Sequence, residues 1–143
     1  TIKEISSTLK IYKKKGNIAL LHCVSNYPCS ITSLNLNSLK LLKKYFKCTI
    51  GYSDHSRGNL ASCLSVVLGS KIIEKHFTLN KNMSGPDHKA SCTPSELKNM
   101  IYEIRKTELI LGKENSTRMI SLKSLDINKL LLLVFSLFHI SSN

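Results

Sequence analysis

Hydrophobic residues occur along the chain in two alternating patterns. Short unbroken apolar runs are typical of strands covered on both faces, and they predict strands at 17–24, 48–52 and 71–77. Longer stretches with helical spacing of apolar residues predict helices at 1–16, 33–46, 58–69 and 93–112. The last helix has the clearest limits, because Thr93, Pro94 and Glu96 form a capping box with proline in the first turn. Gly112 is expected to end it.

Strands and helices therefore alternate along the chain. Such alternation predicts an α/β fold in which parallel strands are joined by right-handed crossovers. A closed (β/α)8 barrel takes about 250 residues. Three strands in 143 residues therefore predict part of a larger α/β unit.

The character of the sequence changes after Gly112. Residues 113–129 are polar and show no clear period, whereas the run LLLLVFSLFHI at 130–140 is almost wholly apolar. This run is too short to cross a bilayer, which takes about 20 residues. Three interpretations stay open: a buried terminal helix, a membrane-associating tail, or sequence that was never selected to fold. We favour the last.

Composition adds a strong positive charge to this picture. The formal net charge is +12, which could mark a surface for nucleic acid or a membrane, steer anionic substrates, or reflect a general lysine bias. Because tryptophan is absent and aromatic residues are not interleaved with the basic ones, we expect no nucleic-acid partner. The five cysteines form no C-x-x-C pair, which predicts free thiols in a reducing cytoplasm rather than disulfides or a zinc site.

Polar residues gather after each predicted strand. SNYP at 25–28 follows the first strand, SDH at 53–55 follows the second, and the third ends in EKHF at 74–77 and leads to MSGPDHK at 83–89. The opposite ends of the strands are ordinary, with Asn17, Cys48 and Lys71. Parallel α/β folds place their chemistry at the carboxyl ends of the strands. We therefore expect a functional site at this edge.

His55 and His76 end consecutive predicted strands. Neighbouring strands lie about 4.8 Å apart, so the two imidazoles could share one divalent ion such as Mn²⁺, Zn²⁺ or Co²⁺. The alternative is a pair of histidines satisfied by hydrogen bonds in a polar rim. Asp87 on the following loop favours the site.

The other polar candidates each have a structural alternative. Ser25 and Ser53 could donate to a phosphate group or only cap helices. Tyr27 could present its phenol to a sugar or anchor its loop, and Asp87 could bind sugar hydroxyls or belong to the Gly-Pro-Asp turn. His22 and Glu74 lie within strands and fit the core or a supporting role.

Four stretches resemble the sialic acid synthase family, which includes N-acetylneuraminate, legionaminic acid and pseudaminic acid synthases. They are LLHCVSNYP, GYSDHS, IIEKHFTLNKNMSGPDHKAS and TPSELKNMIYEIR, in that order. The resemblance covers residues 1–113 and implies the C-terminal part of a TIM-barrel synthase domain. By the family pattern this part is the last three βα units, strands six to eight, with the preceding helix. Residues 114–143 are then an atypical tail, expected to be disordered or unlike the family.

The resemblance also implies a reaction. Members of the family are cytoplasmic transferases of sialic acid biosynthesis that condense phosphoenolpyruvate with an N-acylated hexosamine such as N-acetylmannosamine. His55 and His76 match the catalytic, metal-binding histidines, with Mn²⁺ as the preferred ion and Mg²⁺ or Co²⁺ as alternatives. Ser25 and Ser53 match contacts to phosphoenolpyruvate. Tyr27 and Asp87 match residues that face the amino sugar.

This chain departs from the family pattern at both ends. The earlier strands, with their phosphoenolpyruvate-binding lysines, are absent from it, and so is a small C-terminal domain that completes the site across a homodimer. We therefore expect a truncated form that is inactive by itself. We also expect no membrane partner. A non-catalytic remnant and an unrelated basic binding module are the alternatives.

Overall fold

The computed structural model describes residues 1–12, 18–113 and 132–136. In this part, α1 (Ile2–Tyr12) precedes β1 (Ala19–Cys23), the 3-10 turn η1 (Ile31–Ser33) and α2 (Ser38–Tyr45). The chain continues with β2 (Thr49–Ser53), α3 (Leu60–Val67), β3 (Ile72–His76), α4 (Pro94–Leu111) and β4 (Leu132–Ser136). The predicted α/β class and its three strands are confirmed. The predicted end of the first helix at Gly16 lies outside the described residues.

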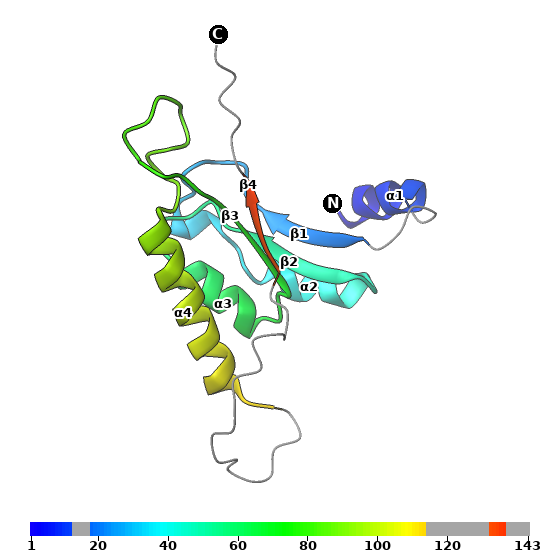
Figure 1. The fold of residues 1–143 in the computed structure, drawn as a ribbon. Helices are drawn as coiled ribbons and strands as arrows, with labels where there is room; N and C mark the ends of the chain where they lie inside the picture. The colour runs from blue at the N-terminus through cyan, green and yellow to red at the C-terminus, as the bar shows by residue number, and fades with distance from the viewer. Residues whose placement is uncertain (13–17, 114–131, 137–143) are drawn as a thin grey trace.

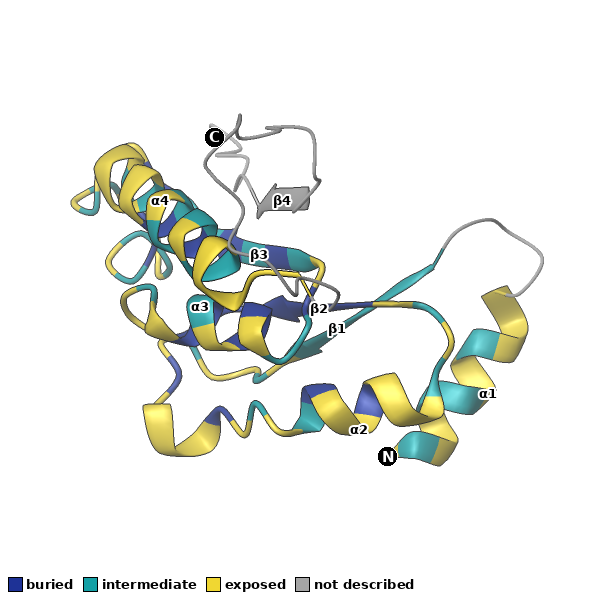
Figure 2. Cartoon of the chain, turned by 90° about the horizontal axis from the view of Figure 1, so that it is seen from below, coloured by how far each residue is buried: buried dark blue, intermediate teal, exposed yellow. Residues whose placement is uncertain are grey.

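The strands form a parallel sheet in the order β1-β2-β3-β4 (Figure 1). Each connection leads to the adjacent strand, always toward the same edge of the sheet. Right-handed crossovers of this kind place their helices on the same face of the sheet. Figure 2 shows α2, α3 and α4 along one side of the strands. We call this side the helix face. The other side, which carries Cys23, Ser53, Glu74 and His76, is the open face.

The hydrophobic core lies between the sheet and these helices. Successive strand residues point to opposite faces, and Ile50, Tyr52 and Ile73 point to the helix face, where each is buried. The helices add the apolar side chains of Leu39, Leu42, Ala61, Val66, Met100 and Ile104. The predicted fully apolar strands therefore bury one face in the core, while the open face of β2 and β3 is largely polar.

Two helix starts differ in how well the sequence predicts them. α4 begins as expected, because the Thr93 hydroxyl accepts a hydrogen bond from the Glu96 backbone and the Glu96 side chain accepts one from the Thr93 backbone. The helix predicted at 33–46 begins later, at Ser38. Asn35 adopts a φ of 41°, a left-handed conformation that asparagine tolerates and that an α-helix cannot contain. Of the predicted helix, Ser33 belongs to η1, and residues 34–37 are not helical.

The apolar run at 130–140 contributes a fourth strand. β4 pairs in parallel with β3, from Ile72 opposite Leu132 to His76 opposite Ser136. None of the three interpretations from the sequence includes a strand here. The rest of the predicted tail, 114–131 and 137–143, lies outside the described residues. Among the helices that the structure describes, none has the length and apolar content that a bilayer crossing requires.

Gly51 in β2 lies too close to its neighbouring strands to carry a side chain without crowding. A Cβ at this position would lie 2.7 Å from the Ile72 carbonyl oxygen and 3.2 Å from Cγ of Leu21. Because the first contact is with backbone, Gly51→Ala is expected to lower the free energy of unfolding by about 1–3 kcal/mol, measured by urea denaturation. Thr49→Ala, at an exposed position of the same strand, is the control and is expected to change it by less than about 1 kcal/mol. Equal effects of the two changes would contradict the crowding at Gly51.

Candidate active site

Three aromatic rings meet at the carboxyl ends of β1, β2 and β3. The centroids of the His55 and His76 rings lie 5.1 Å apart in an edge-on arrangement. The Tyr27 ring lies 4.2 Å from the His76 ring and 5.1 Å from the His55 ring. We call these three residues the ring cluster. The structure thus brings the two histidines together, as their positions after consecutive strands predict.

Loops and strand ends position the ring cluster. His76 is the last residue of β3, and His55 follows the end of β2. Tyr27 lies on the loop after β1, where its hydroxyl is 3.3 Å from Oγ of Ser91 on the loop before α4. The backbone N–H of Cys29 donates to the His55 carbonyl at 2.8 Å, which ties the first loop to the second. The cluster therefore depends on three separate strand–loop connections.

The open face beside the cluster carries further polar side chains. Ser53 is buried, and its hydroxyl donates to Oε1 of Glu74 at 2.6 Å. Sγ of Cys23 lies 3.7 Å from Nε2 of His55. Glu74 therefore supports Ser53, in keeping with the supporting role that the sequence suggests. Cys23 escapes sequence analysis, although its pairing with Ser53 across β1 and β2 places both on one face.

Burial and neighbouring charges shift two pKa values in the cluster. Burial lowers the pKa of His76 and the nearby His55 ring lowers it further, while the carboxylates of Asp87 and Glu74 act in the opposite direction. Both dominant effects favour the neutral ring, which is the form that can bind a metal ion. Burial also raises the pKa of Tyr27. Its hydroxyl therefore stays protonated near neutral pH and can donate a hydrogen bond.

The remaining predicted residues differ in how they lie relative to the ring cluster. Asp87 is half-buried and close enough to the cluster for its charge to raise the pKa of Tyr27, although burial is the larger cause of that shift. Ser25 is exposed on the loop after β1. His22 turns away from the site, and its Nε2 lies 2.7 Å from the Leu34 carbonyl oxygen. His22 is half-buried on the helix face, where its ring stacks on that of Tyr52.

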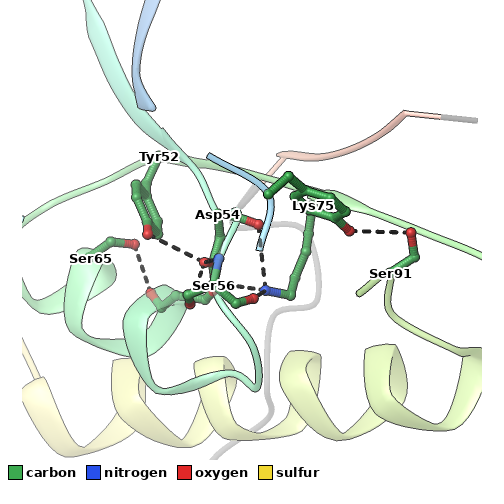
Figure 3. Close-up of polar contacts among 8 residues, drawn as sticks. Tyr52, Asp54, Ser56, Ser65, Lys75 and Ser91 are labelled. Atoms are coloured by element: carbon green, nitrogen blue, oxygen red, sulfur yellow. Dashed lines mark hydrogen bonds and ion pairs between the residues drawn. The ribbon is translucent and has the colours of Figure 1, made fainter. Parts of the chain in front are cut away.

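A buried ion pair lies on the helix face behind the site (Figure 3). Nζ of Lys75 is 3.0 Å from Oδ2 of Asp54, and these side chains are 5% and 0% exposed. Oδ1 of Asp54 accepts hydrogen bonds from the Ser56 backbone and hydroxyl at 2.9 and 2.7 Å, and Oδ2 accepts one from Ser62 at 2.6 Å. Sequence analysis misses this pair, because it assigns roles to the neighbours of these residues in SDH and EKHF but none to Asp54 or Lys75.

A separate cavity of about 260 Å³ lies on the helix side, near the start of α4. Its lining includes Arg57, Lys75, Lys81 and Lys89 but no member of the ring cluster. Two of these lysines already have carboxylate partners, because Lys75 pairs with Asp54 and Lys81 with Glu96. The ring cluster is therefore the better candidate for the site of chemistry.

The donor atoms of the ring cluster fit a divalent metal ion with open coordination positions. His55 and His76 are half-buried imidazoles in contact, and nitrogen ligands of this kind bind first-row transition metals. In the described part of the chain, no three His, Cys, Asp or Glu side chains are grouped to hold a metal. Within the described residues, His55 and His76 are the two imidazoles that would hold such an ion.

Comparison with known proteins supports a synthase assignment. N,N'-diacetyllegionaminic acid synthase of Campylobacter jejuni is 49% identical over 113 residues, which are 76% of this chain and 34% of that protein. The synthase of the same name from Legionella pneumophila is 47% identical over 95 residues, 66% of this chain and 27% of that protein. The crystal structure of N-acetylneuraminic acid synthetase from Leptospira borgpetersenii superimposes with a TM-score of 0.77 at 38% identity, covering 83% of this chain and 42% of that one.

The relatives named here are synthases of sialic-acid-type sugars, and the Leptospira structure shares the α/β fold of this chain. The chain belongs to the NeuB family, which it matches over residues 1–116. It spans about a third of the length of the Campylobacter relative.

Proposed function

We propose that the chain carries the metal-binding part of the active site of an enzyme that condenses phosphoenolpyruvate with an N-acylated hexosamine. The observation that carries this proposal is the contact of His55 and His76 beside Tyr27 at the carboxyl ends of parallel strands. Membership of the NeuB family supports it. N-acetylmannosamine is the model substrate, and the product is a nine-carbon keto-acid sugar.

In the proposed reaction, carbon 3 of phosphoenolpyruvate forms a bond to the aldehyde carbon of the open-chain sugar. Water adds at carbon 2, and the resulting tetrahedral adduct loses phosphate. His55 and His76 would hold a divalent ion, preferably Mn²⁺, which when bound supplies Lewis-acid polarisation of the aldehyde. These two histidines set the position of the aldehyde relative to the other substrate.

The other site residues bind and orient the substrates. Ser53 contacts phosphoenolpyruvate, and its bond to Glu74 fixes the direction of its hydroxyl. Ser25, exposed on the neighbouring loop, is the second contact to this substrate. Tyr27 and Asp87 face the amino sugar, where a protonated phenol donates to hydroxyl or amide oxygens and a carboxylate accepts from hydroxyls.

We place β1, β2 and β3 as strands six to eight of a (β/α)8 barrel. The sequential strand order and the helices on one face support this placement, as does the position of the polar residues at the carboxyl ends of the strands. A closed barrel pairs its last strand with its first. β4 therefore occupies the edge of β3 that the first strand of such a barrel would take.

The chain spans about a third of a curated relative, so we expect further phosphoenolpyruvate contacts to come from outside the sequence given. The test measures phosphate release with phosphoenolpyruvate, N-acetylmannosamine and Mn²⁺. It compares the chain alone with the chain mixed with the unmatched N-terminal segment of the Campylobacter synthase. Release is expected only from the mixture and only with both substrates, and a mixture containing His76→Ala should stay at background.

Two outcomes would contradict the proposal in different ways. Release by the chain alone would show that the described residues suffice for phosphoenolpyruvate binding. A mixture whose segments associate, as shown by co-elution, but which releases no phosphate would contradict the proposed reaction.

A further inference from the structure

Asp54 and Lys75 each stand next to one histidine of the ring cluster. Asp54 precedes His55 and Lys75 precedes His76 in the chain. The Asp54 N–H donates to the Glu74 carbonyl at 2.8 Å, so the β2–β3 ladder extends to this point. Because successive residues point to opposite faces, the ion pair lies on the helix face directly behind the two imidazoles.

The ion pair fixes the backbone on both sides of His55. Asp54 lies before this histidine, and its carboxylate holds the backbone N–H of Ser56, which lies after it, at 2.9 Å. Nζ of Lys75 donates to the Ser56 carbonyl at 2.7 Å. The residue next to His76 is thus bonded to both neighbours of His55, and the relative position of the two rings depends on this connection.

Stability alone is a weak explanation for the presence of these charges. Removing an ion pair from water costs more than the pairing returns unless its geometry is favourable, and well-packed apolar side chains are often as stable in the same place. The Asp54–Lys75 pair is almost completely buried beneath a polar site. Its hydrogen bonds reach β2, β3, α3 and the loop that carries His55. Such a network specifies one arrangement of the backbone where apolar packing would allow several.

We propose that Asp54 and Lys75 are positioning residues, which hold the His55 and His76 rings at the separation needed to share one ligand. This inference deepens the proposed function, because it rests on the assignment of the two histidines as a metal site. Replacing a residue that hydrogen-bonds to a metal ligand typically lowers metal affinity by about 10–100-fold. The ion pair acts through the backbone, where such residues usually act through a direct hydrogen bond.

The test compares the double variant Asp54→Asn, Lys75→Met with the parent chain. This double change removes both charges and keeps the side-chain volumes. The asparagine amide keeps an oxygen acceptor for Ser56, and its NH2 group can donate to the Ser62 hydroxyl. Three quantities are measured: the urea unfolding midpoint, the nuclear Overhauser effect between ring protons of His55 and His76 without metal, and the affinity for Mn²⁺. The midpoint is expected to stay close to that of the parent, the ring contact to be lost and the affinity to fall about 10–100-fold.

The outcomes separate this inference from the proposed function. A ring contact that persists unchanged in the double variant overturns the positioning role, whether or not metal binds. A parent chain that shows the ring contact but no Mn²⁺ affinity contradicts the metal site, and loss of the contact in the variant then still supports positioning. Lys81→Met is the matched control, because it breaks the exposed pair of Lys81 with Glu96 and should leave the ring contact and affinity unchanged.

Discussion

Alanine in place of His76 is expected to lower the affinity of the chain for Mn²⁺ by more than about 100-fold. Replacing a residue that only hydrogen-bonds to a metal ligand already lowers the affinity by about 10–100-fold. His55 and His76 are the paired imidazoles at the site, and losing one leaves a single protein donor. Burial lowers the pKa of His76, so in the parent chain protons compete weakly with metal at neutral pH. Isothermal titration with Mn²⁺ at pH 7 measures the change.

His22→Gln is the matched control for this experiment. His22 lies on the helix face, and glutamine can still donate to the Leu34 carbonyl that its ring contacts. Its Mn²⁺ affinity is expected to equal that of the parent. Equal loss of affinity in the two variants would point to a general effect of histidine removal and would contradict the assignment of His76.

Methionine in place of Lys75 alone is expected to lower the free energy of unfolding by about 3–5 kcal/mol. The side chain of Asp54 is 0% exposed, so without Lys75 its carboxylate stays buried with no cation beside it. The serine hydroxyls that donate to it, Ser56 and Ser62, carry no formal charge and compensate only in part. Urea denaturation followed by circular dichroism measures the effect.

Two comparisons sharpen this prediction. Lys81→Met removes a lysine from a half-exposed pair with Glu96 and is expected to change the free energy of unfolding by less than about 1 kcal/mol. Adding Asp54→Asn to Lys75→Met removes the uncompensated charge and is expected to recover most of the lost stability. A single variant as stable as the Lys81 control would show that the ion pair is not energetically coupled to the fold.

The fold up to residue 113 follows from local patterns. Apolar runs and capping residues predict each strand and helix, and the Thr93 capping box forms as expected. The late start of α2 depends on the left-handed Asn35, a conformation that asparagine permits but does not require. β4 could not be predicted, because an apolar run without alternation is compatible with a strand or a helix. Its pairing with β3 is a long-range contact.

The candidate site is predictable only in part, for a related reason. His55 and His76 are found because both follow strands, and parallel strands end at the same edge. Tyr27 contacts both rings, and its loop position alone does not reveal this. Asp54 and Lys75 lie between residues with apparent roles, and their importance depends on burial. The helices packed on the helix face bury these two side chains. Sequence periodicity does not predict how those helices are positioned against the strands.

The pairing of β4 with β3 also determines how copies of the chain can associate. An exposed strand edge offers unpaired backbone groups to another molecule. Among the described strands, β4 covers the outer side of β3, so β1 and β4 are the two edges of the sheet. A sheet with open edges at both ends can add copies without limit and grow into a fibre. A closed barrel has no edge strands, so pairing of β1 and β3 with further strands of such a barrel would remove both routes of association.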